Sequence, residues 1–184
     1  MNELLIKTEN SLEFKDFYEI IEDIATNETV LEMKNYKQHY DTTTYEHCMH
    51  VAFLSYKIAK RLHLDVISLA RASMLHDLFL YDWRKKQRHI ELSGLHAFVH
   101  PKIALKNASA LFTLNEKEKD IILKHMWPVT FALPKYKESF VITFVDKYCA
   151  VAESANYYIS ILNKKKIYRY AYVFLCLLGS FAVV

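Results

Sequence analysis

Apolar residues recur along most of this chain with the spacing of an α-helix. Between Thr44 and Leu62, the residues Val51, Leu54, Ile58 and Leu62 lie three or four positions apart. This spacing places them on one face of a helix. We therefore predict a helix over residues 45–62 whose apolar face points into a core.

Polar residues that can cap helices precede several other periodic segments. Only two glycines and three prolines interrupt the chain, whereas hairpin-rich proteins need many such turn residues. The predicted helices are 12–24 after Ser11, 28–33 after Asn27, 45–62 after Thr44, one from Asp65 through Leu80, one beginning near Pro101, one from Asn115 toward Trp127 with Glu118 completing a capping box, and 138–163. Segments 81–100 and 127–137 are expected to be loops. The predicted fold class is all-α, with a single-domain helical bundle.

Composition limits the classes of protein that fit this pattern. The 184 residues are enough for one domain with a continuous core, and 52% of them are hydrophobic and 24% charged, as in an ordinary globular protein. A net charge of +3 without a long basic run gives no indication of a nucleic-acid surface. Cys48, Cys149 and Cys176 form no CxxC pattern, and the first residues do not resemble a secretory signal. We expect a cytoplasmic protein without disulfides.

The last residues differ in composition from the rest. Segment 167–184 is almost wholly apolar and follows Lys164, Lys165 and Lys166. It is shorter than the roughly 20 apolar residues of a membrane-spanning helix. We therefore divide the chain into a domain over 1–166 and a hydrophobic C-terminal helix over 167–184, which either packs on protein or contacts a membrane.

Charged and polar residues inside the apolar helices indicate chemistry. His47 lies one turn before Val51 on the inward face, and Asp77 and Asp146 interrupt long apolar runs. A buried carboxylate without a partner costs several kcal/mol. Arg71 is more than a helical turn from Asp77, whereas one divalent cation satisfies a carboxylate and an imidazole together. Metal binding is therefore the preferred explanation.

These residues resemble the H…HD…D pattern of the HD superfamily of metal-dependent phosphohydrolases. The motifs are His47 in YEHCMHVA, His76 and Asp77 in MLHDLF, and Asp146 in FVDKY, and the resemblance covers roughly residues 40–153. His100 in FVHPKIALKNA and His125 in IILKHMWP extend the series to that of members with two metals. The resemblance then implies one ion on His47, His76, Asp77 and Asp146, and a second on Asp77, His100 and His125.

The same resemblance implies hydrolysis of a phosphate ester or anhydride in a small, nucleotide-type substrate by a metal-activated water. Asp77 and Lys147 are the expected catalytic residues, and His39, His96 and Trp83 are expected to bind substrate. The divalent ion is iron, manganese, cobalt, nickel or zinc, which the sequence does not distinguish. Two alternatives stay open: a single-metal nucleoside monophosphate phosphatase and a non-catalytic nucleotide-binding HD protein.

The order of these motifs also resembles that of the symmetrical dinucleoside tetraphosphate hydrolases of bacteria and of cyclic-dinucleotide phosphodiesterases. The latter carry a His-His pair and a GYP motif, neither of which occurs in this sequence. No motif identifies the substrate, and the sequence leaves the oligomeric state open.

Overall fold

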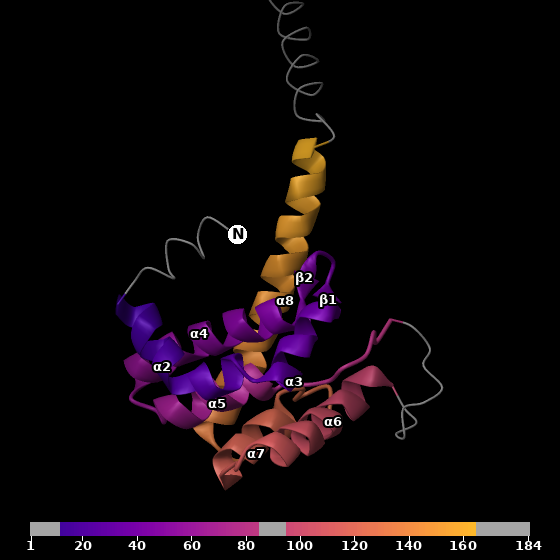
Figure 1. Cartoon of the computed structure of the whole chain (residues 1–184). Coiled ribbons are helices and arrows are strands. Elements are labelled where there is room, and N and C mark those ends of the chain that lie inside the picture. The colour runs from indigo at the N-terminus through magenta and orange to yellow at the C-terminus, as the bar shows by residue number, and fades with distance from the viewer. Residues whose placement is uncertain (1–11, 85–94, 165–184) are drawn as a thin grey trace, which may run out of the picture.

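The computed structural model describes residues 12–84 and 95–164, and its secondary structure is almost entirely helical. The elements are α2 (Leu12–Ala25), α3 (Glu28–Leu31), the 3-10 helix η1 (Glu32–Asn35), β1 (Lys37–His39), β2 (Thr42–Thr43), α4 (Thr44–Leu62), α5 (Val66–Leu75), α6 (His96–Leu111), α7 (Glu116–Lys124) and α8 (Lys137–Lys164). The all-α prediction is confirmed. The two strands form a small antiparallel hairpin beside α8 (Figure 1).

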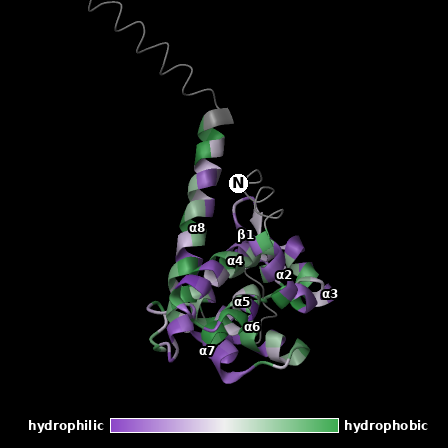
Figure 2. Ribbon diagram, turned by 90° about the vertical axis from the view of Figure 1, so that its left-hand side faces the viewer, coloured by the Kyte–Doolittle hydropathy of each residue, from purple (hydrophilic) through white to green (hydrophobic). Residues whose placement is uncertain are grey.

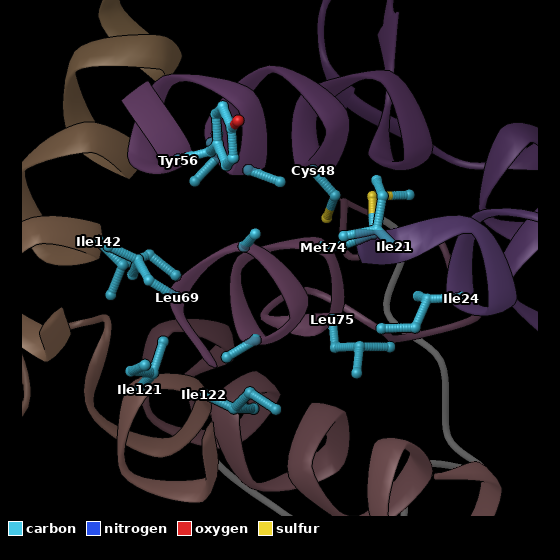
Figure 3. Packing of buried hydrophobic residues seen from close by; sticks show 14 of the residues in the cluster. Ile21, Ile24, Cys48, Tyr56, Leu69, Met74, Leu75, Ile121, Ile122 and Ile142 are labelled. Atoms are coloured by element: carbon cyan, nitrogen blue, oxygen red, sulfur yellow. The ribbon is translucent and has the colours of Figure 1, made fainter. Parts of the chain in front are cut away.

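Helix α5 lies at the centre of the bundle. Its sequence is apolar on nearly every side, and a helix of that kind is stable only when neighbours surround it. Figure 3 shows Leu69, Met74 and Leu75 of α5 among side chains from the surrounding helices, with Tyr56 of α4 and Ile122 of α7 on opposite sides. The chain segment that leaves α5 therefore starts inside the bundle.

Arg71 of α5 holds two other helices to this central one. Its guanidinium donates to both carboxylate oxygens of Asp23 on α2, at 2.6 and 2.8 Å, and lies 3.6 Å from Glu118 on α7. This bidentate pair fixes the angle between α2 and α5. As expected, Arg71 is not the partner of Asp77.

Local capping explains where several helices begin. Asn27 accepts hydrogen bonds from the amides of Thr29 and Val30, and Asn115 forms the predicted capping box with Glu118. Asp65 caps α5 through the amide of Ser68. Such starts were predictable because each depends on residues close together in the sequence.

Several local predictions were wrong. The cap of α4 is Thr43, which is extended and forms a capping box with Glu46, whereas Thr44 is already helical. Leu62 is 58% exposed, because the buried face of α4 is centred on His47, Cys48 and Val51. The segment predicted from 28 to 33 is α-helical only to Leu31 and continues as η1.

Another error concerns α6, which begins at His96 rather than near Pro101. Pro101 is the sixth residue of the helix and cannot donate to the carbonyl of Ala97, yet the helix continues through it. Residues 96–100 therefore belong to a helix and not to the predicted loop. Residues 85–94 lie outside the described part of the chain.

Helix α8 runs beside the body and then projects beyond it (Figures 1 and 2). The long helix predicted over 138–163 is thus confirmed, and the loop before it extends from the end of α7 to residue 136. Within residues 12–84 and 95–164, no helix combines the length and apolarity needed to cross a bilayer. The predicted division at 166/167 falls outside the described residues, as does Cys176, while Cys48 and Cys149 are free thiols.

Candidate metal centre

Residues from five segments converge in the interior of the bundle. His47 comes from α4, His100 from α6, His125 from the end of α7 and Asp146 from α8. His76 and Asp77 come from the turn after α5. All six residues are buried, with relative exposures between 0% and 9%. The structure therefore brings together every residue that the sequence predicted as a metal ligand.

The position of His76 and Asp77 differs from the prediction of a helix through Leu80. Helix α5 ends at Leu75, and the amide of Phe79 donates to the carbonyl of Asp77 at 2.7 Å, closing a tight turn. The ring of His76 also bonds back to the carbonyl of Ser73. Both side chains face the other predicted ligands, with Nε2 of His76 3.6 Å from Asp146 and Oδ1 of Asp77 3.3 Å from His100.

One half of the centre gathers around Asp146. Its Oδ1 atom lies 3.1 Å from Nε2 of His47 and 3.6 Å from Nε2 of His76. These three residues offer ligand atoms that lie within 4.8 Å of one another. One ion can therefore reach all three side chains.

The other half gathers around Asp77. Its Oδ1 atom lies 3.3 Å from Nε2 of His100 and 3.6 Å from Nε2 of His125, while Oδ2 lies 3.6 Å from Nε2 of His76. The Nε2 atoms of His100 and His125 are 2.8 Å apart. Because His76 approaches both carboxylates, the two halves are adjacent.

Hydrogen bonds at Nδ1 orient all four imidazoles. Nδ1 faces the carbonyl of Ser73 in His76, that of His96 in His100 and that of Ile122 in His125, at 2.7 to 2.8 Å. In His47 it faces the Glu153 carboxylate at 3.0 Å. These oxygens can only accept, so Nδ1 carries a hydrogen and Nε2 is the ring nitrogen that faces the centre. Four Nε2 atoms and two carboxylates thus point inward.

The electrostatics of the centre follow from this concentration of groups. Burial lowers the pKa of His47, but its bonds to Asp146 and Glu153 outweigh burial and raise the pKa to about 10. Burial, His100 and His76 lower the pKa of His125 to about 3. Burial also disfavours the carboxylate forms of Asp77 and Asp146, yet the surrounding imidazoles hold both pKa values well below the ordinary range. Both aspartates are therefore charged at neutral pH.

Two atoms of the predicted ligands, Nε2 of His76 and Oδ1 of Asp77, are among the buried atoms that lack a hydrogen-bonding partner in the described part of the chain. Nε2 of His100 lies 3.3 Å from Oδ1 and is also 2.8 Å from Nε2 of His125. A buried polar atom without a partner is costly. A divalent cation satisfies both atoms at once, and the imidazole and carboxylate donors suit one.

The predicted substrate-binding residues lie next to the centre. The ring of His39 in β1 is 5.2 Å from that of His47. Trp83 stacks on His96 at 5.3 Å, and His96 stacks on His100 at 4.5 Å, so a column of rings leads from the surface inward. Trp83 is 38% exposed. Its outer side is accessible to a ligand.

Lys147 lies near the centre but is held by backbone. Its ammonium donates to the carbonyl of His125 at 3.2 Å and to that of Thr143 at 3.1 Å. Burial lowers its pKa, with Asp146 acting in the opposite direction. In this position Lys147 links α8 to the end of α7.

Two residues that hydrogen-bond to the predicted ligands were not predicted from the sequence. Glu153 is buried and accepts from Nδ1 of His47 and of His50, both at 3.0 Å, and these contacts lower its pKa to about 2 against the opposing effect of burial. It lies seven residues after Asp146, which places both on one helix face, and that spacing was a usable signal. Gln38 donates to Oδ2 of Asp77 at 2.6 Å from a separate hairpin, and no local pattern could have identified it.

A model of the HD domain family matches residues 44–151, which is more than half of the chain and includes all six residues that converge in the centre. No curated protein matches the chain, and no solved structure matches it either.

Proposed function

The chain belongs to the HD domain family, and from this we propose that it is a metal-dependent hydrolase of phosphate esters or anhydrides that uses a metal-activated water. One observation carries the proposal: four oriented Nε2 atoms and two buried carboxylates converge in one place. The two buried carboxylates are stabilised when positive charge lies between them. The HD family supplies the reaction class.

We assign one ion to His47, His76, Asp77 and Asp146, and a second to Asp77, His100 and His125. Asp77 is then shared, which suits its central position between Nε2 of His76 and those of His100 and His125. When bound, divalent ions supply a water nucleophile that ionises near pH 7 and neutralise charge on a phosphoryl group. The protein fixes the geometry through the Nδ1 hydrogen bonds.

We propose a nucleotide-type substrate because of the residues at the rim of the centre. A phosphate at the ions would leave the rest of the molecule near Trp83 and His96, whose stacked rings suit a planar base. His39 flanks the His47 side. The Lys147 ammonium, already bound to two carbonyls, is proposed to stabilise phosphate charge from the α7–α8 side.

The test combines metal analysis with a substrate screen. Full-length protein is loaded anaerobically with manganese, iron, cobalt, nickel or zinc, and release of phosphate or nucleotide is measured for mononucleotides, dinucleoside polyphosphates and cyclic dinucleotides. We expect turnover of at least one class and loss of at least 100-fold in Asp77→Asn. The matched control Asp16→Asn, an exposed residue of α2, should retain full activity.

Two results would overturn parts of the proposal. Saturable nucleotide binding without turnover under any metal would mean that the protein is a nucleotide-binding HD protein and not an enzyme. Turnover that persists unchanged in Asp77→Asn would place the chemistry elsewhere in the chain.

A further inference from the structure

The outer face of α8 carries a regular row of exposed apolar residues. Asp146 and Glu153 are seven residues apart and point into the bundle, and the row lies on the other side of the helix. It consists of Phe144, Tyr148, Val151, Ala155, Tyr158 and Leu162, all of which are exposed. We call these six residues the α8 seam.

The spacing of the α8 seam is that of a coiled coil. Successive residues are separated by four, three, four, three and four positions, which is the heptad repeat of 3.5 residues. A helix that merely covers a globular core follows a broader stripe with a period near 3.6. A heptad row over 19 residues, here flanked by the exposed Ile159, instead matches another helix lying alongside it.

The charges around the seam favour a protein partner over a lipid surface. From Tyr148 to Leu162 the sole charged residue is Glu153, which is buried and faces His47 and His50. Interfacial membrane helices usually carry lysines and arginines on a polar face beside the apolar one. This stretch has neither residue, and it has no exposed charge that would repel an identical helix.

The area of the seam is sufficient for a specific contact. Phe144, Tyr148 and Val151 are 65 to 69% exposed, and Tyr158 and Leu162 are 54% and 38% exposed. With about 150–250 Å² per aromatic side chain, the seam presents roughly 600 Å² per copy. Two such faces reach the lower end of specific interfaces, about 1,200 Å² in total.

The projecting half of α8 is also held in place by the hairpin. The ring of Tyr40, which has a positive φ of 49° at the turn between β1 and β2, stacks on Tyr157 at 4.2 Å. Its hydroxyl lies 2.7 Å from that of Tyr158. This contact fixes the helix at the point where it leaves the body (Figure 1).

We propose that the α8 seam is the interface between two copies of this chain, which pair their α8 helices as a two-stranded coiled coil. The same surface on each copy forms the contact, so the dimer is closed by a two-fold axis. Because the metal centre lies on the opposite side of α8, pairing leaves it uncovered. The inference is independent of the proposed catalytic activity.

Sedimentation equilibrium of the full-length protein tests the proposal. The wild type should have the mass of a dimer. The double variant Val151→Glu, Leu162→Glu should have half that mass, because two glutamates per copy would face each other in the seam. The matched control Ile67→Glu, an equally exposed apolar position on α5, should stay dimeric. The far-UV circular dichroism of all three proteins should agree, because the changed side chains are exposed.

Other outcomes contradict the proposal and identify another occupant. A monomeric wild type that floats with vesicles of phosphatidylcholine and phosphatidylglycerol, while the double variant does not, would assign the seam to lipid. A monomeric wild type that does not bind vesicles would indicate that residues 165–184 cover the α8 seam. A double variant that stays dimeric would place the interface elsewhere.

Discussion

His100 and His125 face each other through Nε2 atoms that are 2.8 Å apart. Both rings direct Nδ1 at backbone carbonyls, so their Nε2 atoms face each other and Asp77. The low pKa of His125, about 3, disfavours relief of this contact by protonating that ring. A second ion beside Asp77 would bind both Nε2 atoms, so this pair is where the number of ions can be tested.

The first prediction concerns the number of ions. His125→Ala should reduce the metal content from about two ions per chain to about one, because the second ion then keeps only His100 and the shared Asp77. Elemental analysis of protein loaded anaerobically measures this. His63→Asn, at the exposed left-handed cap of α4, should keep two ions. An unchanged content in His125→Ala would support the single-metal alternative.

The second prediction concerns Glu153 as a positioning residue. Glu153→Gln removes the charge that holds Nδ1 of His47 and His50, so His47 should bind metal less well. Loss of such an outer partner weakens metal affinity by about 10- to 100-fold. Competition with a chromogenic chelator measures the affinity.

The control for Glu153→Gln is Glu138→Gln on the same helix. Glu138 is equally buried but pairs with Lys117 and the amide of Asp65, away from the centre. The substitution Glu138→Gln should lower thermal stability and leave metal affinity unchanged. Equal losses of affinity in both variants would mean that Glu153 acts only through the stability of α8.

The third prediction uses Glu138 as a reporter of acid sensitivity. Burial raises its pKa, but hydrogen bonds from the amide of Asp65 and the ammonium of Lys117 outweigh burial and lower it. A carboxyl with a lowered folded-state pKa stabilises above its unfolded pKa of about 4.5 and loses that contribution as pH falls through the folded value. The free energy lost in Glu138→Gln, about 1–3 kcal/mol at pH 7, should therefore shrink below about pH 4.5.

Urea unfolding of the wild type and Glu138→Gln between pH 3 and 7 measures this difference. Glu116→Gln serves as the control, because Glu116 pairs with Lys119 on the exposed surface of α7, where water screens the pair and its pH-dependent difference should be much smaller. A difference for Glu138→Gln that stays constant over this range would contradict the lowered pKa.

The sequence predicted the parts of the fold that depend on neighbouring residues. Asn27, Asp65 and Asn115 cap helices through amides two or three residues away, and these contacts follow from local sequence alone. The end of α5 does not follow from local sequence, because His76 and Asp77 turn the chain toward partners from α6, α7 and α8. The apolar pattern of α5 continues past Leu75, where contacts with other helices end the helix.

The candidate centre was predictable for a related reason. His47, Asp77 and Asp146 are polar residues in apolar runs, so burial without a cation was implausible from the start. The residues that orient them carry no such signal, as Gln38 shows: it reaches Asp77 from a hairpin 39 residues earlier in the chain. Contacts between distant segments place Gln38 beside Asp77, and a single sequence does not reveal such contacts.

The fourth prediction concerns substrate recognition. If a base stacks on the exposed side of Trp83, Trp83→Ala should raise KM by about 10- to 100-fold, since such stacking contributes about 1–3 kcal/mol. Trp83→Phe should keep most of the affinity. Metal content should stay the same in both, because Trp83 is separated from His100 by His96. A lower kcat at unchanged KM would contradict a role in binding the base.

The last prediction is that metal removal destabilises the protein, because the buried carboxylates and imidazoles of the centre then lose the interaction with the ion. An ion at 100 times its Kd adds about 2.7 kcal/mol, and each kcal/mol shifts Tm by about 2–4 °C in a domain of this size. Transition-metal ions should therefore raise Tm of chelator-treated protein by roughly 5–10 °C. Magnesium should raise it less, since imidazole-rich sites suit it poorly. In Asp77→Asn most of the shift should vanish in scanning fluorimetry. A shift of equal size in that variant would mean that the stabilising ions bind outside this centre.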